Sequence, residues 1–283
     1  MRCLLLLCIA VVACGGRRED VIVVGSKNFT EQRILGELLA QTVESVGLKA
    51  ERKFDLGGTF VCDAALRAGQ IDMYVEYTGT ALSAILKEDA TGKSPREVYE
   101  RVKERYAKDG LVWMEPLGFD NTFALVIRGE DSKRLGLRTI SDVVPYAKAW
   151  RAGFGYEFKE RPDGYRRLQN IYNLQFRDVT TLDLGLLYHA LIDERVDIVA
   201  GNSTDGQIRH HLLAVLRDDR NSFPPYQAAI VVREEQLQSY PALTHVLNRL
   251  NSRLSNDTII ALNDAVDGLH KSPASAVHDI VPR

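Results

Sequence analysis

Cysteine is scarce in this chain of 283 residues, and three of its four cysteines, Cys3, Cys8 and Cys14, lie close to the N-terminus. Cys62 is therefore alone in the rest of the sequence. A lone cysteine excludes an internal disulfide and a cysteine-based metal cluster in that part of the chain. We expect Cys62 to pack inside a helix.

An excess of charge of one sign is also absent. Lysine and arginine number 36 against 38 aspartates and glutamates, which gives a formal net charge of -2, and the basic residues form no block. Nucleic-acid binding requires a basic patch or stripe on the surface. We therefore exclude DNA and RNA as partners.

A hydrophobic run long enough to span a bilayer is missing as well. Arg2 precedes the short apolar run LLLLCIAVVA, which is typical of a secretory signal. The following VVAC, Val11 to Cys14, resembles the bacterial lipobox, in which the signal is cut before a cysteine that receives a lipid. Residues 1–20 are thus expected to be a lipoprotein signal and a short linker, with Cys14 as the lipid anchor. The protein would then be extracytoplasmic and membrane-anchored, in the periplasm or at the cell surface; a plain signal peptide cut nearby is the alternative.

The segment VIVVGSKNFTEQRILGELLA, which begins at Val21, has the strand–turn–helix pattern of a phosphate-binding loop but lacks its glycines. We expect this turn to hold a small anion such as a carboxylate rather than a nucleotide. Asn28 is expected to cap the helix with Glu31 as its capping-box partner, and Lys27 lies beside the positive end of the helix dipole. An ordinary capped helix with a surface lysine is the alternative.

Strand-like and helix-like segments alternate along the rest of the chain. The hydrophobic fraction of 45% is sufficient for one sizeable core or two smaller ones. Alternation of this kind predicts an α/β protein whose parallel sheets are covered by helices. The expected strands are VIVVG, KAERKF, IDMYVEY, LVWMEP and NTFALVIRG. The expected helices are FTEQRILGELLAQTVESVG, TFVCDAALRAG, TGTALSAILK and SPREVYERVKERYAKDG.

Two segments far apart in the sequence are similar to one another. AALRAGQIDMYVEYT, residues 64–78, aligns without a gap to HALIDERVDIVAGNS, residues 189–203. The alignment pairs Asp72 with Asp197, so we expect these two residues to serve turn geometry rather than acid–base chemistry. A chance similarity is one explanation. The other is a repeat that builds two similar lobes whose loops face one cleft, where open α/β sheets bind ligands.

The motifs GSKNFTEQ, LGGT, EYTGT, EFKERPDGY, STDG and FPPYQAA occur in this order. Together they resemble the substrate-binding proteins of bacterial ABC importers for glycine betaine, choline and carnitine. The resemblance implies a two-lobed type II periplasmic-binding-protein fold, in which each lobe is a mostly parallel sheet flanked by helices and the ligand lies in the interlobe cleft. Lobe one would comprise residues 21–120 and 225–283, lobe two residues 121–224, with a hinge near Asp120 and Pro224-Pro225.

The same resemblance implies the partners of the protein. They are a small quaternary-ammonium ligand and a membrane permease driven by its ATPase. Neither a cofactor nor a metal is expected, and the protein should be a monomer.

Motif by motif, the resemblance also implies the binding residues. A betaine needs cationic donors for its carboxylate and aromatic faces for its trimethylammonium group. Lys27, Thr80 and Arg161 match the carboxylate positions. Tyr77 and Tyr226 match two walls of the aromatic box. The turn that contains Lys27 would thus hold one end of a zwitterion.

The other two walls of the box depart from the family pattern. Phe123 stands where tyrosine is common, and Asn121 before it remains available as a polar neighbour. Asn202 stands where another tyrosine is usual, and an amide offers no π face. Three aromatic walls can still hold a quaternary ammonium, and the space beside Asn202 favours a bulkier or more hydrogen-bonding ligand than glycine betaine. Carnitine, or a histidine-derived betaine such as ergothioneine, fits that description.

Each of these residues also has an explanation without a ligand. Tyr77 and Phe123 could pack in a core, Arg161 could pair with Glu157 one helical turn back, and Asn202 could help to cap the next helix. An enzyme is the rival class, but the sequence has no H-E-x-x-H and no G-x-S-x-G motif. We therefore expect no catalysis. A ligand-sensing module for an amino-acid-like solute remains an alternative.

Overall fold

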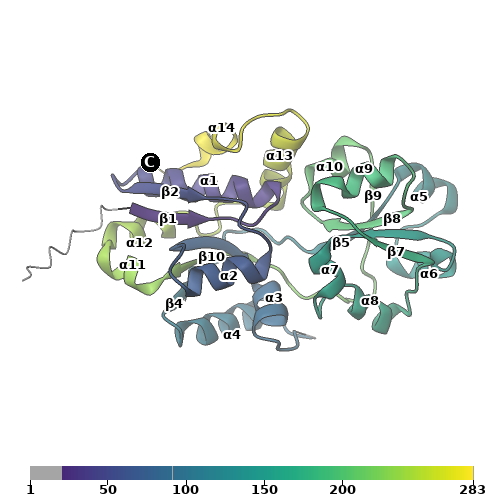
Figure 1. Cartoon of the computed structure of the whole chain (residues 1–283), viewed down its shortest axis with the longest axis horizontal. Helices are drawn as coiled ribbons and strands as arrows, with labels where there is room; N and C mark the ends of the chain where they lie inside the picture. The colour runs from purple at the N-terminus through teal and green to yellow at the C-terminus, as the bar shows by residue number, and fades with distance from the viewer. Residues whose placement is uncertain (1–20, 91, 283) are drawn as a thin grey trace, which may run out of the picture.

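The computed structural model describes residues 21–282 except Thr91, and the predicted signal with Cys14 lies outside the described residues. The described chain contains two separate five-stranded sheets, each flanked by helices (Figure 1). In both sheets, parallel pairs on one side are followed by one reversed strand. The predicted α/β class with two mostly parallel sheets is therefore confirmed.

The first sheet has the strand order β2-β1-β3-β10-β4. Its strands are β1 (Val21–Gly25), β2 (Lys49–Lys53), β3 (Met73–Tyr77), β4 (Leu111–Trp113) and β10 (Ala228–Arg233). The helical segments around it are α1 (Thr30–Glu44), α2 (Thr59–Arg67), α3 (Thr78–Thr80), the π-helical turn η1 (Ala81–Ile85), α4 (Pro95–Ala107), α11 (Glu234–Ser239), α12 (Pro241–Asn248), α13 (Asn256–Asp267), α14 (Pro273–Val277) and the 3₁₀ turn η3 (His278–Ile280).

The second sheet repeats the pattern with the order β7-β6-β8-β5-β9. Its strands are β5 (Phe123–Ile127), β6 (Arg151–Phe154), β7 (Asp178–Thr181), β8 (Ile198–Asn202) and β9 (Ala214–Leu216). The helical segments around it are α5 (Gly129–Leu135), α6 (Ile140–Ala147), α7 (Tyr156–Glu160), α8 (Tyr165–Tyr172), the 3₁₀ turn η2 (Leu184–Leu186), α9 (Leu187–Ile192) and α10 (Gly206–His210).

Each sheet is apolar on both faces because helices cover both faces. Successive side chains of a strand point to opposite faces. In β10, Ile230 and Val232 pack with α1 and α12, whereas Ala229 and Val231 pack with α2 and α4 on the other face. The reversed strand of the second sheet, β5, divides its side chains between two clusters in the same way. Continuous apolar strands are the sequence pattern that burial on both faces requires.

The similar segments found in the sequence occupy equivalent places in the two sheets. The Asp72 carboxylate accepts a hydrogen bond from the backbone N–H of Val23 at 2.8 Å, and the Asp197 carboxylate accepts one from Arg151 at 2.7 Å. Both acids thus tie the start of one strand to a parallel neighbour, a structural role that differs from the turn geometry predicted for them. The following strands, β3 and β8, both end at the cleft.

Two segments connect the sheets and lie side by side. The backbone N–H of Asn121 donates to the carbonyl of Tyr226 at 3.1 Å, and the backbone N–H of Tyr226 donates to the Asp120 carboxylate at 2.7 Å. Asp120 also forms an isolated bridge with Gln227. The lobe boundaries at 120/121 and 224/225 and the hinge there remain predictions.

Helix α13 packs against α1 of the first half and against α10 of the second. It packs against α10 so closely that a side chain at Gly206 would meet the backbone of Asp264. Figure 1 shows α13 beside α10 at the junction of the two halves. The two lobes are therefore in contact through more than the two connecting segments.

Cys62 is a fully buried free cysteine in α2, as predicted.

Within residues 21–282, Thr91 aside, no helix has the length and apolar character to cross a bilayer. Over the same residues, no group of three or more histidine, cysteine or acidic side chains is placed to hold a metal ion.

Candidate functional site

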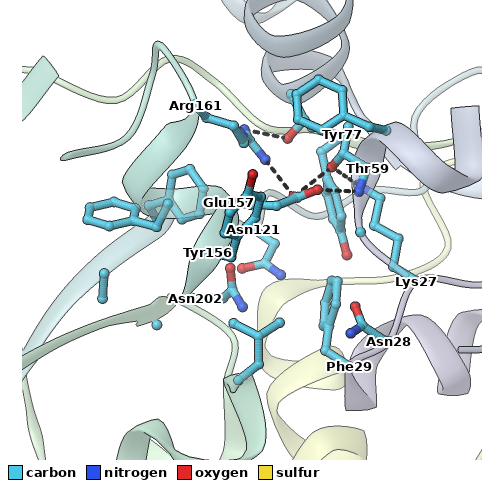
Figure 2. Close-up of a pocket in the computed structure, with 18 of the residues that line it drawn as sticks. Lys27, Asn28, Phe29, Thr59, Tyr77, Asn121, Tyr156, Glu157, Arg161 and Asn202 are labelled. Atoms are coloured by element: carbon cyan, nitrogen blue, oxygen red, sulfur yellow. Dashed lines mark hydrogen bonds and ion pairs between the residues drawn. The ribbon is translucent and has the colours of Figure 1, made fainter. Parts of the chain in front are cut away.

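A cavity of about 410 Å³ lies between the two sheets and is lined from both (Figure 2). Tyr77 at the end of β3 and Asn202 at the end of β8 face it from opposite lobes. The residues predicted to bind a ligand all line this one cavity: Lys27, Tyr77, Thr80, Asn121, Phe123, Arg161, Asn202 and Tyr226. Their individual roles in binding remain predictions.

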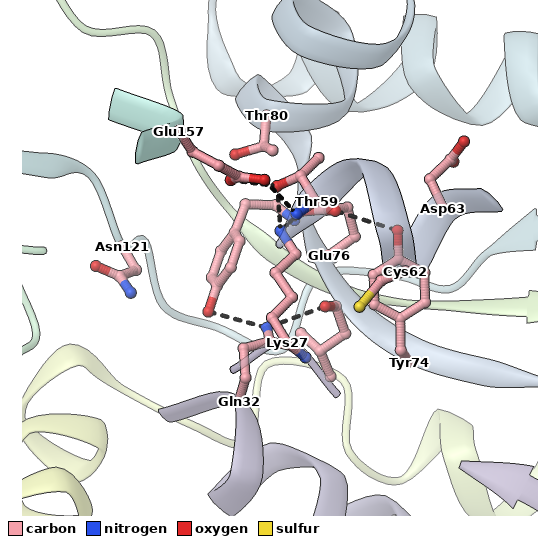
Figure 3. A network of polar contacts seen from close by, with 12 residues as sticks. Lys27, Gln32, Thr59, Cys62, Asp63, Tyr74, Glu76, Thr80, Asn121 and Glu157 are labelled. Carbon is pink, nitrogen blue, oxygen red and sulfur yellow. Dashed lines mark hydrogen bonds and ion pairs between the residues drawn. The ribbon is translucent and has the colours of Figure 1, made fainter. Parts of the chain in front are cut away.

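Lys27 follows strand β1 and lies in the cavity wall, buried with 3% exposure. Its Nζ donates to the Glu76 carboxylate at 2.6 Å and to the Thr59 hydroxyl at 2.9 Å (Figure 3). Burial raises the pKa of Glu76, and the attraction of Lys27 offsets part of that rise. Lys27 is thus one half of a buried ion pair rather than the surface lysine of the alternative interpretation.

The predicted cap of the following helix is wrong. Helix α1 begins at Thr30 with Phe29 at the N-cap position, and no side chain caps it. Asn28 lies one residue too early and lines the cavity instead. Glu31 cannot serve as a capping-box partner because its carboxylate points into the junction between the lobes.

Glu31 is the centre of a buried polar cluster. One carboxylate oxygen accepts hydrogen bonds from the hydroxyl of Tyr77 at 2.5 Å and the amide of Asn121 at 2.9 Å. The other accepts from the hydroxyl of Thr204 in lobe two and from the amide of Asn263 in α13. Burial raises the pKa of Glu31, and these four hydrogen bonds lower it in part. The cluster fixes the orientation of two residues of the cavity wall, Tyr77 and Asn121, and joins them to the second lobe.

Arg161 reaches the cavity from the end of α7 and is buried with 4% exposure. It donates to the Asp163 carboxylate at 3.0 and 2.5 Å and to the Thr80 hydroxyl at 3.1 Å across the cleft. Glu157 lies 3.6 Å from its other guanidinium nitrogen, which is the pairing that the alternative interpretation expected. The hydroxyl of Tyr226 donates to Asp163 at 2.6 Å, so this network also orients an aromatic wall.

The aromatic walls contact one another edge to face. The rings of Phe123 and Tyr226 have centroids 5.7 Å apart at 72°. Two of the rings form cation–π contacts with basic side chains of the protein. Arg161 lies 4.7 Å from the centroid of Phe123, and Lys27 lies 5.1 Å from the centroid of Tyr77. The electron-rich faces of these rings are thus aligned with positive charge, which is the interaction a quaternary ammonium would make.

Asn202 lies directly opposite Phe123 in the antiparallel pair of β8 and β5. Its backbone N–H donates to the Asp205 carboxylate at 2.8 Å, and its side-chain amide donates to the same carboxylate at 3.4 Å. The hydroxyl of Tyr188 donates to Asp205 at 2.6 Å. Burial raises the pKa of Asp205 to about 6. Where the family pattern has an aromatic wall, this chain therefore has the side-chain amide of Asn202, which is hydrogen-bonded to the buried carboxylate of Asp205.

Several residues of the cavity were not among the predicted site residues. Most of them are apolar, with Thr59 and two acids among them, and they come from both lobes: Phe29, Thr59, Phe60, Val61, Tyr156, Glu157, Leu182, Asp183 and Leu184. The LGGT motif could have indicated that Thr59 lies in the site, because two glycines before a helix allow a ligand or another segment to approach the backbone closely. Leu182 and Leu184 carry no motif, and their positions depend on how the lobes meet.

Comparison with known proteins places the chain in a family. The family model for the substrate-binding domain of the ABC-type glycine betaine transport system, OpuAC, matches residues 20–282. A solved structure described as a glycine betaine/carnitine/choline ABC transporter is 30% identical. It covers 92% of this chain and 97% of its own, with a TM-score of 0.75.

Two curated relatives are similar over almost the whole chain. The ergothioneine transport permease/ergothioneine binding protein EgtU of Helicobacter pylori strain G27 is 36% identical over 94% of this chain, which spans 48% of that protein, about half its length. The carnitine transport binding protein OpuCC of Listeria monocytogenes is 32% identical over 95% of this chain and 88% of that one. The two sheets have the type II periplasmic-binding-protein fold, as do the solved structure described above and that of lactococcal OpuAC. The chain belongs to the family of substrate-binding domains of glycine-betaine-type ABC importers.

Proposed function

We propose that the protein binds a quaternary-ammonium compound in the cavity between its lobes and delivers it to an ABC permease. The observation that carries this proposal is the meeting of Tyr77, Phe123 and Tyr226 with the cations Lys27 and Arg161 in one cavity. Aromatic faces attract a trimethylammonium group, which has no N–H to donate. Enclosure between two lobes removes water from that contact and strengthens it.

We further propose that the ligand is bulkier than glycine betaine. Asn202 replaces a ring of the expected box, and the cavity of about 410 Å³ falls in the range of roughly 300–1,000 Å³ that holds drug-sized ligands. Relatives named for carnitine and ergothioneine support this size class. Carnitine and ergothioneine are the candidates we would test first.

The remaining parts of the proposal follow the family. Its substrate-binding proteins are extracytoplasmic transport components, so we propose a protein without enzymatic activity that acts as a monomer. The lipid anchor at Cys14 rests on the sequence motif alone. A ligand-sensing role for an amino-acid-like solute is the second candidate, because it would use the same two lobes.

A thermal-shift screen of the mature protein tests the proposed function. A ligand that binds the native state raises the melting temperature as its concentration exceeds the dissociation constant. We expect betaine, carnitine and ergothioneine-type compounds to raise it and ordinary amino acids to leave it unchanged. Stabilisation by amino acids alone would favour the sensing role, and conversion of a compound into a product would overturn the transport role.

A pair of variants tests the location of the site. Phe123→Leu removes a π face from the cavity without removing a hydroxyl group, and we expect it to weaken binding by about 0.5–2 kcal/mol. Phe176→Leu is the matched control, because Phe176 packs with Phe154 and Tyr165 in the core of lobe two. Calorimetry should show a loss of affinity in the first variant only. Equal losses in both would place the ligand elsewhere.

A further inference from the structure

Glu157 extends from lobe two, at the start of α7, to the opposite wall of the cavity. One of its carboxylate oxygens accepts a hydrogen bond from the backbone N–H of Thr59 at 2.5 Å, and the other accepts from the Thr59 hydroxyl at 3.0 Å. The same hydroxyl accepts a hydrogen bond from Lys27. Figures 2 and 3 show this chain of contacts from lobe two to lobe one.

The backbone of lobe one is shaped to admit this carboxylate. A Cβ atom at Gly58, the residue before Thr59, would lie 2.2 Å from the Glu157 carboxylate oxygen. Any side chain at position 58 would therefore displace Glu157 from Thr59. Gly58, the second glycine of the LGGT motif, thus leaves the space that the contact between Glu157 and Thr59 needs.

Both cations of the cavity wall are already paired with carboxylates of the protein, so neither is free to bind the carboxylate of a ligand. Lys27 and Arg161 are the basic residues that line the cavity in the described part of the chain. Lys27 is paired with Glu76 at 2.6 Å, and Arg161 is paired with Asp163 at 2.5 Å. Glu157 adds a third carboxylate 3.6 Å from Arg161. The two positive charges therefore face the carboxylates of Glu76, Asp163 and Glu157, and Asp183 adds a further acid to the lining of the cavity.

A ligand carboxylate placed near Thr59 and Arg161 would meet the charge of Glu157. Like charges at such short distance repel, and the repulsion is strongest in a site that excludes water. The side chain of Glu157 is 27% exposed, so it remains accessible from the cavity. A cation without a carboxylate meets no such repulsion, and the surplus negative charge attracts it.

We propose that Glu157 is a specificity-determining residue: its carboxylate takes the position of a ligand carboxylate beside Thr59 and Arg161, and so disfavours glycine betaine relative to choline and to longer zwitterions that place their carboxylate elsewhere. This inference rests on the proposed function. A zwitterion must displace Glu157 or direct its own carboxylate to another part of the wall, whereas choline can bind with Glu157 in place.

Glu157→Gln tests the inference because it removes the charge and keeps an acceptor for the backbone N–H of Thr59. Calorimetry with choline, glycine betaine and carnitine gives the ratio of the dissociation constant for choline to that for each zwitterion. We expect the ratio for glycine betaine to rise at least tenfold in the variant and the ratio for carnitine to rise less. The matched control is Glu160→Gln on the same helix, which is exposed and should leave the ratio unchanged.

Gly58→Ala is a second variant that reaches the same contact from lobe one. Gly58 has φ −85°, so alanine fits the backbone there, and its Cβ should push Glu157 away. We expect the ratio to rise in the same direction. It replaces the first variant if Glu157→Gln does not fold.

The outcomes separate this inference from the function on which it rests. If wild type binds quaternary-ammonium compounds and both variants change all affinities by the same factor, Glu157 only holds the lobes together and the inference is overturned. A ratio that falls also overturns it. If wild type binds none of the three compounds, the proposed function itself is wrong and the inference falls with it.

Discussion

At the residue scale, the substitutions with the largest expected effect on stability concern buried acidic side chains and their partners. Glu76 is fully buried and paired with Lys27, whereas Glu31 is fully buried among neutral donors. A buried ion pair contributes little net stability, but loss of one partner leaves an uncompensated charge. The cavity wall is therefore more sensitive to single substitutions than to paired ones.

Lys27→Met should lower the free energy of unfolding by about 3–5 kcal/mol, because it leaves the Glu76 carboxylate buried without a partner. Adding Glu76→Gln should recover much of that loss, since the remaining amide keeps a neutral acceptor for the backbone N–H of Tyr77. Urea unfolding of both single variants and the double variant measures the effect. Lys53→Met, at a partly exposed position on β2, is the control. Simple addition of the two single-variant effects would contradict the pairing.

Asn202→Tyr addresses the missing ring. A tyrosine at this position would add a π face and reduce the free volume, so we expect glycine betaine to bind about 0.5–2 kcal/mol more tightly. The same ring should obstruct carnitine and ergothioneine. Calorimetry on both proteins should therefore show a swap in preference. If the folded variant binds every compound as wild type does, Asn202 lies outside the site.

At the scale of elements, the loop between β8 and α10 carries a titratable group at the lobe junction. Burial raises the pKa of Asp205 to about 6, whereas an unfolded aspartate has a value of about 3.9. The folded protein thus binds this proton more tightly than the unfolded chain does. The stability that comes from this difference is present below about pH 4 and is lost as the pH rises to about 6.

Asp205→Asn should remove that dependence. The unfolding free energy of wild type is expected to fall relative to the variant between about pH 4 and pH 6.5 and then run parallel to it. Urea denaturation at closely spaced pH values measures this difference. Asp193→Asn, at an exposed position after α9, should follow wild type throughout. Parallel curves for wild type and Asp205→Asn over the whole range would show that Asp205 ionises normally.

The elements were more predictable from the sequence than the contacts between them. The segment FTEQRILGELLAQTVESVG was expected to form a helix, and α1 occupies Thr30–Glu44 within it, with Ile34, Leu35 and Leu38 buried. The repeat register placed Asp72 and Asp197 at equivalent positions, although the backbone N–H that each acid binds lies on a neighbouring strand far away in the sequence. The helix pattern is short-range and lies within one segment, whereas the partners of the two acids depend on how the strands pair.

The acids of the site were harder to predict. Glu31 has the spacing of a capping-box residue, but four partners from distant segments determine where its carboxylate points. Glu157 was expected only as a helical partner of Arg161, and its contact with Thr59 arises where the lobes meet. No local pattern encodes such a contact, because its two halves lie on different lobes.

At the scale of the whole molecule, the predicted lipid would determine where the protein works. Cys14→Ala should move the protein from the membrane fraction to the soluble fraction after expression in a bacterium. Globomycin treatment of wild type, which blocks cleavage of lipoprotein signals, provides an independent control. Identical fractionation of wild type and variant would show that Cys14 carries no lipid.

The position of β10 in the first sheet has a consequence for biosynthesis. This strand separates β3 from β4, yet it follows every strand of the second sheet in the sequence. A nascent chain that ends before Ala228 can pair β1 with β2 and β3, but β3 and β4 cannot be joined through their central neighbour. The first lobe therefore cannot complete its sheet until β10 has been synthesised. The substrate-binding proteins of this family are extracytoplasmic, and a chain exported before β10 has been synthesised would cross the membrane with an unfinished first lobe.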